Sequence, residues 1–301
     1  MAQANWTRGV FTALVTPMQT GATLDLPAVD EARLAALVEA QIAAGVQGLV
    51  ACGTTGEAAT LTADEQARVV RLVVKTAAGR VPVLAGVGSP STATSIVFGQ
   101  AALSAGATGL LAVTPYYNKP PQEGLYQHYL ALCALGAPIV LYNVPGRTGC
   151  DLQPETVVRL CKQTEIVALK EASGQVGRTQ TLSRLLGSRL ALFSGEDALN
   201  LPLYCVGAAG TISVLANGMP QEVVKVWHLF SSGQLSEARV LHQRLLPLTD
   251  LLFCEPNPIP AKAALHMMGL MDNVARLPLV PISQENAVRL RQELLALRLL
   301  S

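Results

Sequence analysis

IVALKEA, residues Ile166–Ala172, is a short apolar and β-branched run that nevertheless carries a lysine near its end. Runs without polar interruption are typical of strands in a parallel sheet that is covered on both faces. An ammonium group is expensive in such surroundings, because burial strips away its hydration. The segment therefore predicts a buried parallel strand, and it raises the question of what Lys170 does there.

Seven further runs of the same kind occur along the chain, each closed by glycine, proline or polar residues. They begin at Gly9, Gly48, Val81, Thr108, Pro138, Leu190 and Gly210. Helical patterns fill most of the intervals between them, and Thr62 and Glu65 have the spacing of a capping box at the start of one predicted helix. Apolar strands that alternate with amphipathic helices indicate a parallel sheet covered by helices.

Eight such units fit an α/β fold of the (β/α)8 TIM-barrel type. The alternative, a doubly wound open sheet, is disfavoured because no G-x-G-x-x-G follows the first strand. After Asn217 the pattern contains helices alone. We therefore predict a catalytic barrel domain over residues 1–220 and a C-terminal helical region over residues 221–301.

The composition argues against several classes of function. The chain is 50% hydrophobic and 14% charged, and its net charge of +1 gives no field that would attract nucleic acid or an anionic membrane. No uninterrupted apolar stretch reaches the roughly 18 residues of a membrane span, and no signal region precedes the first strand, so a cytoplasmic protein is expected. The six cysteines form no C-x-x-C pair and the four histidines show no ligand spacing. We predict reduced, buried thiols and no protein-bound metal.

Polar residues gather just after the predicted strands, which is where a barrel places its active site. Burial of Lys170 favours the neutral amine, and a neutral amine is a nucleophile for a ketone carbon. A salt bridge to Glu171 is the plain alternative, but adjacent residues on a strand point to opposite faces. Tyr142 ends the preceding strand, so it either exchanges protons with a carbinolamine on Lys170 or serves only in packing.

The loops after other strands supply further candidates. Thr54 and Thr55 lie between two glycines and offer hydroxyls and backbone amides to a small carboxylate or a proton relay, although an ordinary turn has the same composition. Arg147 is either a fixed cation for a second carboxylate or a solvated loop residue. Tyr116 and Tyr117 also fit an aromatic packing pair. Together these residues indicate a Schiff-base lyase or aldolase that acts on a small 2-oxo acid.

An ordered set of motifs adds a family resemblance. Over most of the chain run GTTGEAATL, VTPYYN, LYNVPGRTG, KEASG, SGED, GTISV and EPNPIPAK. Each string alone is unspecific, but the ordered set closely resembles the dihydrodipicolinate synthase (4-hydroxy-tetrahydrodipicolinate synthase) branch of the class I aldolase family that also holds N-acetylneuraminate lyase. R-T-G after Y-N-V-P, together with EPNPIP, favours this branch.

The resemblance implies catalytic roles for four side chains. Lys170 would form an imine with pyruvate, and Tyr142 would be the central proton shuttle. Thr55 and Tyr117 would complete a proton relay, with Tyr117 reaching into the site of a neighbouring subunit. No cofactor is expected, because the imine is itself the electron sink.

The resemblance also implies how the substrates are held. The backbone around Thr54 and Thr55 would bind the pyruvate carboxylate, with Gly195 and Ile212 lining the pocket, and Arg147 would bind the carboxylate of L-aspartate 4-semialdehyde. The product would be 4-hydroxy-tetrahydrodipicolinate, from the first step of the lysine branch of diaminopimelate biosynthesis. The resemblance further implies a cytoplasmic homotetramer, built as a dimer of dimers, which is the typical assembly of this family.

Regulation and substrate choice leave alternatives open. Family members that lysine inhibits carry histidines and other polar or acidic side chains where this chain has Ala63, Gln66, Pro90 and Thr94, so weak or absent inhibition is expected. Another pyruvate-type aldolase, such as N-acetylneuraminate lyase or a 2-keto-3-deoxy sugar acid aldolase, uses the same chemistry. A catalytically silent metabolite-binding homologue is the alternative outside enzymes.

Overall fold

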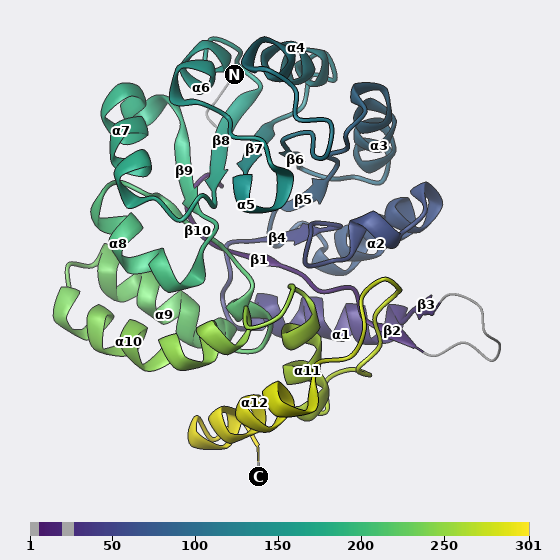
Figure 1. Ribbon diagram of the computed structural model, residues 1–301, viewed down its shortest axis with the longest axis vertical. Coiled ribbons are helices and arrows are strands. Elements are labelled where there is room, and N and C mark those ends of the chain that lie inside the picture. The colour runs from purple at the N-terminus through teal and green to yellow at the C-terminus, as the bar shows by residue number, and fades with distance from the viewer. Residues whose placement is uncertain (1–5, 20–26, 301) are drawn as a thin grey trace.

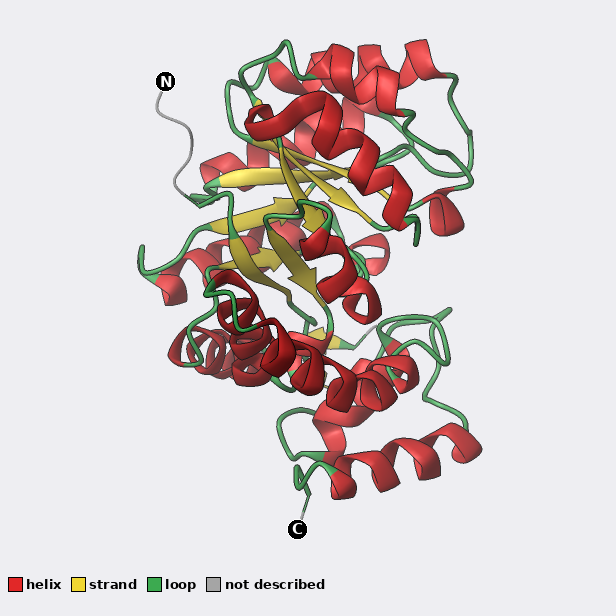
Figure 2. Ribbon diagram, turned by 90° about the vertical axis from the view of Figure 1, so that its left-hand side faces the viewer, coloured by secondary structure: helices red, strands yellow, loops and turns green. Residues whose placement is uncertain are grey.

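A computed structural model describes residues 6–19 and 27–300 and shows a closed barrel surrounded by helices (Figures 1 and 2). Eight parallel strands close the barrel in the order β1-β10-β9-β8-β7-β6-β5-β4, so the predicted barrel is confirmed. The strands are β1 (Gly9–Ala13), β4 (Gly48–Ala51), β5 (Val83–Gly86), β6 (Gly109–Val113), β7 (Ile139–Asn143), β8 (Ile166–Glu171), β9 (Ala191–Ser194) and β10 (Gly210–Ser213). A short antiparallel pair, β2 (Met18–Gln19) and β3 (Ala28–Val29), was not predicted because two-residue strands carry no periodic signal.

Helices cover the outside of the barrel and continue beyond it. They are α1 (Glu31–Ala43), α2 (Ala63–Ala77), α3 (Thr92–Ser104), α4 (Gln122–Cys133), α5 (Pro145–Thr148), α6 (Pro154–Leu160), α7 (Val176–Leu186), α8 (Asn200–Cys205), α9 (Pro220–Ser231), α10 (Leu235–Leu251), α11 (Ile259–Met267) and α12 (Gln284–Ala296). The capping box of Thr62 and Glu65 begins α2, as predicted. Figure 1 shows α11 and α12 below α1, apart from the strands. The domain boundary at residue 220 stays a prediction, since α9 packs against β1.

Two apolar cores hold the strands in place. One fills the barrel interior, where the rings of Phe11 and Phe193 meet edge to face with centroids 5.4 Å apart. The other lies between the strands and the surrounding helices. Gly48 makes the interior packing possible, because a Cβ there would stand 2.0 Å from the Phe11 ring. The strands are therefore packed on both faces, and this packing holds the side chains at their carboxyl ends in position.

A buried group of charges fastens the C-terminal segment to the barrel. Arg276 is 1% exposed and donates to both carboxylate oxygens of Glu65, at 2.6 and 2.7 Å. These bonds hold the pKa of Glu65 at about 2. Lys262, equally buried, forms an ion pair with Glu57 and donates to the carbonyl of Val274 at 2.7 Å. Burial lowers the pKa of Lys262 and Glu57 opposes that shift, so this lysine has a structural counterion.

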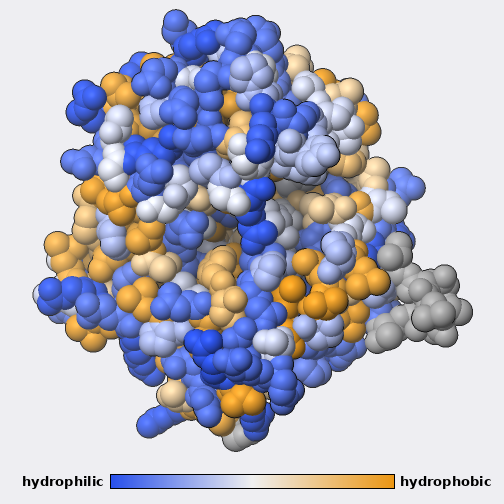
Figure 3. All heavy atoms as spheres, in the orientation of Figure 1, coloured by the Kyte–Doolittle hydropathy of each residue, from blue (hydrophilic) through white to orange (hydrophobic). Residues whose placement is uncertain are grey.

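The surface is mixed rather than uniformly polar. The face shown in Figure 3 carries separate apolar patches on a mainly hydrophilic ground. Among the described residues, no helix has both the length and the apolar character needed to cross a lipid bilayer. The prediction of buried thiols is correct for Cys52, Cys133 and Cys150, and Cys161 is half-buried. It is wrong for Cys205 and Cys254, which are exposed: Cys205 is the last residue of α8, and Cys254 lies in the turn after α10.

His128 makes the stability of the fold sensitive to acid. It lies on α4, its Nδ1 is 2.9 Å from the Thr92 hydroxyl on α3, and burial lowers its pKa from the ordinary 6.5 to about 4. The unfolded chain therefore takes up this proton at a higher pH than the folded protein does. We expect the free energy of unfolding to fall as the pH drops from 6.5 towards 4, with a contribution from His128 of about 2 kcal/mol by pH 5.

Urea unfolding of the wild-type protein and of His128→Gln, each at pH 7.5 and pH 5, checks this expectation. Glutamine keeps a partner for Thr92 but cannot be protonated, so the variant should lose less stability between the two pH values. Equal losses in both proteins would show that other groups cause the acid sensitivity. Carboxylates such as Glu65, whose pKa is about 2, lose their contribution only at lower pH.

Candidate active site

The carboxyl ends of β7 and β8 bring Tyr142 and Lys170 together. The two residues are directly paired in the strand register, and the Lys170 amine lies 4.4 Å from the centroid of the Tyr142 ring. Lys170 is 5% exposed. No carboxylate of residues 6–19 and 27–300 lies within ion-pair distance of its amine. The site thus contains a buried amine that lies over a phenol ring and has no ion-pair partner among the described residues.

Glu171 points away from Lys170, as strand alternation predicts. Its carboxylate accepts a hydrogen bond from Arg178 Nε at 2.7 Å and another from the backbone amide of Ser173 at 2.9 Å. The alternative of a Lys170–Glu171 salt bridge is therefore excluded. The carboxylate beside the lysine in sequence belongs to a different cluster, behind the strand.

Gly195 directly follows β9, and Ile212 lies on β10, the next strand around the barrel. A Cβ on Gly195 would stand 3.0 Å from Lys170 Cε and 2.7 Å from the Cβ of Ala172, so glycine keeps this side of the lysine open. Ile212 is 1% exposed and belongs to the interior core, which also includes Tyr142. Gly195 is therefore beside Lys170, whereas Ile212 shares the barrel interior with Tyr142.

A cavity of about 530 Å³ opens at this end of the barrel. Of the predicted site residues, Thr54, Tyr142 and Arg147 line it. Thr55 is buried instead, and its hydroxyl accepts a hydrogen bond from Asn257 Nδ2 at 3.0 Å. The pair of threonines after β4 is thus divided: Thr54 borders the open space and Thr55 is tied to the C-terminal region.

Arg147 lies at the mouth of the cavity on the short helix α5. Its guanidinium is exposed and makes a long contact, 3.5 Å, with the carbonyl of Asn257. The cation is therefore free to take up an anion. Only Glu57 and Arg147 carry charge among the described residues that line the cavity, and Glu57 is already paired with Lys262.

Tyr116 and Tyr117 do not form the packing pair that was considered as an alternative. Tyr116 lines the cavity, and burial raises the pKa of its phenol. Tyr117 is 91% exposed and has a backbone φ of +72°, a region that non-glycine residues rarely occupy. Within the described part of the chain, its ring is therefore almost entirely exposed to solvent.

Two residues near the site were not identified from the sequence. Asn257 contacts Thr55 through its side chain and Arg147 through its carbonyl, although about two hundred positions separate it from Thr55. Burial raises the pKa of Glu196, while Lys170 and Arg147 oppose that shift, so this carboxyl lies in the field of both cations. EPNPIP and SGED were recognised as motifs, but neither string indicates which of its residues faces the site.

Comparison with known proteins agrees with this geometry. Residues 6–297 match the model of the dihydrodipicolinate synthetase family. The chain belongs to this family. A 4-hydroxy-tetrahydrodipicolinate synthase from Sorangium cellulosum is 52% identical over 278 residues, which cover 92% of this chain and 91% of the relative.

Solved structures of dihydrodipicolinate synthases superimpose along nearly the whole chain. The enzyme from Acinetobacter baumannii, crystallised with pyruvate, has a TM-score of 0.94 and 42% identity and covers 98% of this chain and 100% of its own. The enzyme from Cyanidioschyzon merolae, with lysine bound, has a TM-score of 0.94 and 38% identity and covers 99% of this chain and 100% of its own. Membership of the dihydrodipicolinate synthetase family therefore rests on both sequence and fold.

Proposed function

We propose that this protein condenses pyruvate with L-aspartate 4-semialdehyde to 4-hydroxy-tetrahydrodipicolinate, the first step of the lysine branch of diaminopimelate biosynthesis. The observation that carries the proposal is the buried Lys170 amine, which has no ion-pair partner among the described residues and lies against Tyr142. Tyr142 and Arg147 both line the adjoining cavity. The names of the family's relatives and the pyruvate complex of the Acinetobacter baumannii enzyme support the proposal.

The chemistry follows from an amine and a phenol at one site. The Lys170 amine attacks the ketone carbon of pyruvate, and the carbinolamine loses water to give an imine. Tyr142 supplies the proton for that water and takes up protons released in later steps. Loss of a methyl proton gives an enamine, whose carbon attacks the aldehyde. The amino group of the second substrate then attacks the imine carbon, and Lys170 leaves as the free amine.

The carboxylates of the two substrates need separate partners. We place the pyruvate carboxylate at the backbone around Thr54 and Thr55, with Gly195 and Ile212 beside it. Arg147 would take the carboxylate of the aldehyde, because its fork of donors is exposed at the cavity mouth. A sugar-acid aldolase would use another residue where Arg147 stands, which disfavours that alternative.

The proton relay needs a hydroxyl after β4 and a phenol from a second copy. We propose Thr55 and Tyr117 for it, and Thr54 is the alternative hydroxyl because it borders the cavity. The 91% exposure of Tyr117 in one chain supports a role in a neighbouring site. A cytoplasmic homotetramer, in which one dimer contact completes the relay, is the assembly that we propose.

Turnover of pyruvate with L-aspartate 4-semialdehyde, coupled to the reductase that consumes the product, tests the function. Activity in the presence of a chelator is expected, because no step needs a metal. Pyruvate that borohydride traps on the protein without any turnover of this aldehyde would keep the Schiff base and overturn the second substrate. Neither trapping nor turnover would favour a silent metabolite-binding protein.

Lysine should inhibit this enzyme weakly or not at all. Gln66 and Thr94 line the cavity, but the Gln66 amide already donates to the carbonyl of Ala58 at 3.0 Å. Ala63 and Pro90 have no polar side chain, so an incoming ammonium group would meet no free carboxylate in the described part of this region. The initial rate at millimolar lysine is therefore expected to stay close to the rate without it. Half-inhibition at that level would contradict the expectation, once lysine is shown not to affect the coupling reductase.

A further inference from the structure

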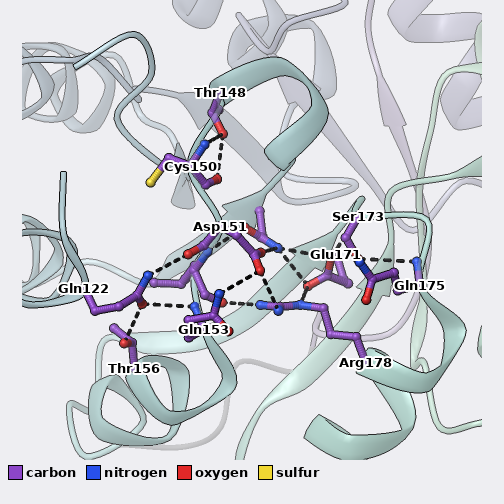
Figure 4. Close-up of polar contacts among 12 residues, drawn as sticks. Gln122, Thr148, Cys150, Asp151, Gln153, Thr156, Glu171, Ser173, Gln175 and Arg178 are labelled. Atoms are coloured by element: carbon purple, nitrogen blue, oxygen red, sulfur yellow. Dashed lines mark hydrogen bonds and ion pairs between the residues drawn. The ribbon is translucent and has the colours of Figure 1, made fainter. Parts of the chain in front are cut away.

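A cluster of polar side chains lies behind β7 and β8, on the side away from the cavity (Figure 4). We call it the rear cluster: Asn143, Asp151, Glu171 and Arg178. The strand register places its members opposite the reactive pair, because Tyr142 is paired with Lys170 and the next residues, Asn143 and Glu171, are paired with each other. Each of the two reactive residues is therefore followed directly, on its own strand, by a residue of the rear cluster.

Arg178 lies at the centre of this cluster, in the first turn of α7. Its Nε donates to Glu171 at 2.7 Å and its Nη1 to Asp151 at 3.2 Å, while Nη2 donates to the carbonyl of Leu152. Figure 4 shows its side chain between the two carboxylates. The guanidinium is 7% exposed, so it serves as an internal fork rather than a surface charge.

Asn143 closes the cluster from the other strand. Its amide nitrogen donates to Asp151 at 2.8 Å and to the Glu171 oxygens at 3.2 and 3.3 Å, and its oxygen accepts from the amide of Leu152 at 3.0 Å. The loop that carries Arg147 leaves β7 at Asn143 and returns to the cluster at Asp151 and Leu152. The two ends of that loop are thus hydrogen-bonded to each other, and the returning end is also bonded to Arg178 within the rear cluster.

The charges in the cluster depend on one cation. Glu171 is 3% exposed, and a buried carboxylate is tolerated only with a close counter-charge and satisfied hydrogen bonds. Asn143 brings Glu171 and Asp151 to one amide, so without Arg178 two carboxylates would face each other there. Their repulsion would act on the backbone beside Lys170 and at the end of the Arg147 loop.

We infer that Arg178 is a positioning residue of the reaction, acting through Glu171 on Lys170 and through Asp151 on Arg147. The part that concerns Asp151 and Arg147 rests on the proposed function, because it assumes the aldehyde substrate. The part that concerns Glu171 and Lys170 needs only the imine with pyruvate. Arg178 touches neither substrate. Its contact with Glu171 should affect formation of the imine, and its contact with Asp151 should affect binding of the aldehyde. These two effects can be measured separately.

The decisive variant is Arg178→Lys, which keeps the charge and loses the fork. A lysine reaches one carboxylate but not both, so the two strands and the loop lose their common anchor. We expect kcat to fall about tenfold and the KM for the aldehyde to rise about tenfold, because small displacements of reacting groups cost rate steeply. The measurements are made well below the melting temperature of the variant, which is determined by circular dichroism.

Two milder variants separate the branches of the cluster. Glu171→Gln should slow the trapping of pyruvate by borohydride and lower kcat, with little change in the KM for the aldehyde. Asp151→Asn should raise the KM for the aldehyde several-fold and leave pyruvate trapping at the wild-type rate. Arg80→Lys is the matched control: Arg80 forms a similar fork with Glu39, at 2.6 and 2.8 Å, on the surface, and this change should leave all parameters unaltered.

A purely structural role gives a different result. Arg178→Lys would then melt at a lower temperature while kcat, both KM values and the trapping rate stay at wild-type values, and this outcome would overturn the inference. If the wild-type protein traps pyruvate but does not turn over the aldehyde, the proposed second substrate fails. The trapping rates of Arg178→Lys and Glu171→Gln still decide whether the rear cluster positions Lys170.

Discussion

Replacement of Lys170 by methionine is expected to abolish turnover and the covalent trapping of pyruvate together. Methionine is similar in length and apolar, so it fills the buried position against Tyr142 without the amine that forms the imine. The loss in kcat should be on the order of 10⁶-fold, the scale seen when a covalent enzyme loses its nucleophile. Coupled turnover and mass spectrometry after borohydride reduction with pyruvate provide the two measurements.

Lys262 makes the test specific, because it is a second buried lysine in the same protein. It is paired with Glu57 and donates to a backbone carbonyl, whereas Lys170 has neither kind of partner among the described residues. Peptide mapping of the reduced wild-type protein should therefore find the pyruvate adduct on the peptide that contains Lys170. An adduct on Lys262, or labelling that persists in Lys170→Met, would refute the assignment.

The strands of this fold could be predicted because their signal is local. A strand covered on both faces is a short uninterrupted apolar run, and all eight runs became barrel strands that begin within two residues of the expected positions. The β2–β3 pair was missed because two-residue strands are set by tertiary contacts and leave no period in the sequence. The exposed Cys205 and Cys254 were misjudged for a related reason: an apolar neighbourhood in sequence does not decide which side chains of a helix end or a turn face solvent.

The active site was predictable to the extent that strand geometry determines it. Alternation along β8 separates Lys170 from Glu171, and adjacent strands bring Tyr142 to the lysine, so this pair follows from the sequence. The contact of Asn257 with Thr55 does not, because it joins segments that are distant along the chain. The sequence also could not show that Thr54 lines the cavity while Thr55 is buried against Asn257, because nothing in the sequence distinguishes two adjacent threonines in one loop.

Tyr142→Phe should reduce kcat by about 10²- to 10⁴-fold, the range for loss of a general acid–base group, while the KM for pyruvate changes little. Phenylalanine keeps the ring that lies 4.4 Å from the Lys170 amine, so it preserves the packing and the cation–π contact and removes only the hydroxyl. The decisive measurement is the rate at which the imine forms, followed by quenching with borohydride at short times. We expect slow formation of a complete adduct, because the amine can still attack but the carbinolamine no longer has a positioned proton donor for the departing water.

Tyr126→Phe is the matched control for this variant. The Tyr126 ring also carries a cation, since the Arg159 guanidinium lies 4.0 Å from its centroid, but the pair is on α4 and α6 at the outside of the barrel. The control should react at the wild-type rate. A kcat for Tyr142→Phe close to that of the wild-type protein would reduce Tyr142 to a packing residue. The proton transfer would then belong to another hydroxyl that lines the cavity, such as that of Thr54. Slow formation of a complete adduct would instead establish two separate roles for Tyr142: its ring positions Lys170, and its hydroxyl transfers the proton.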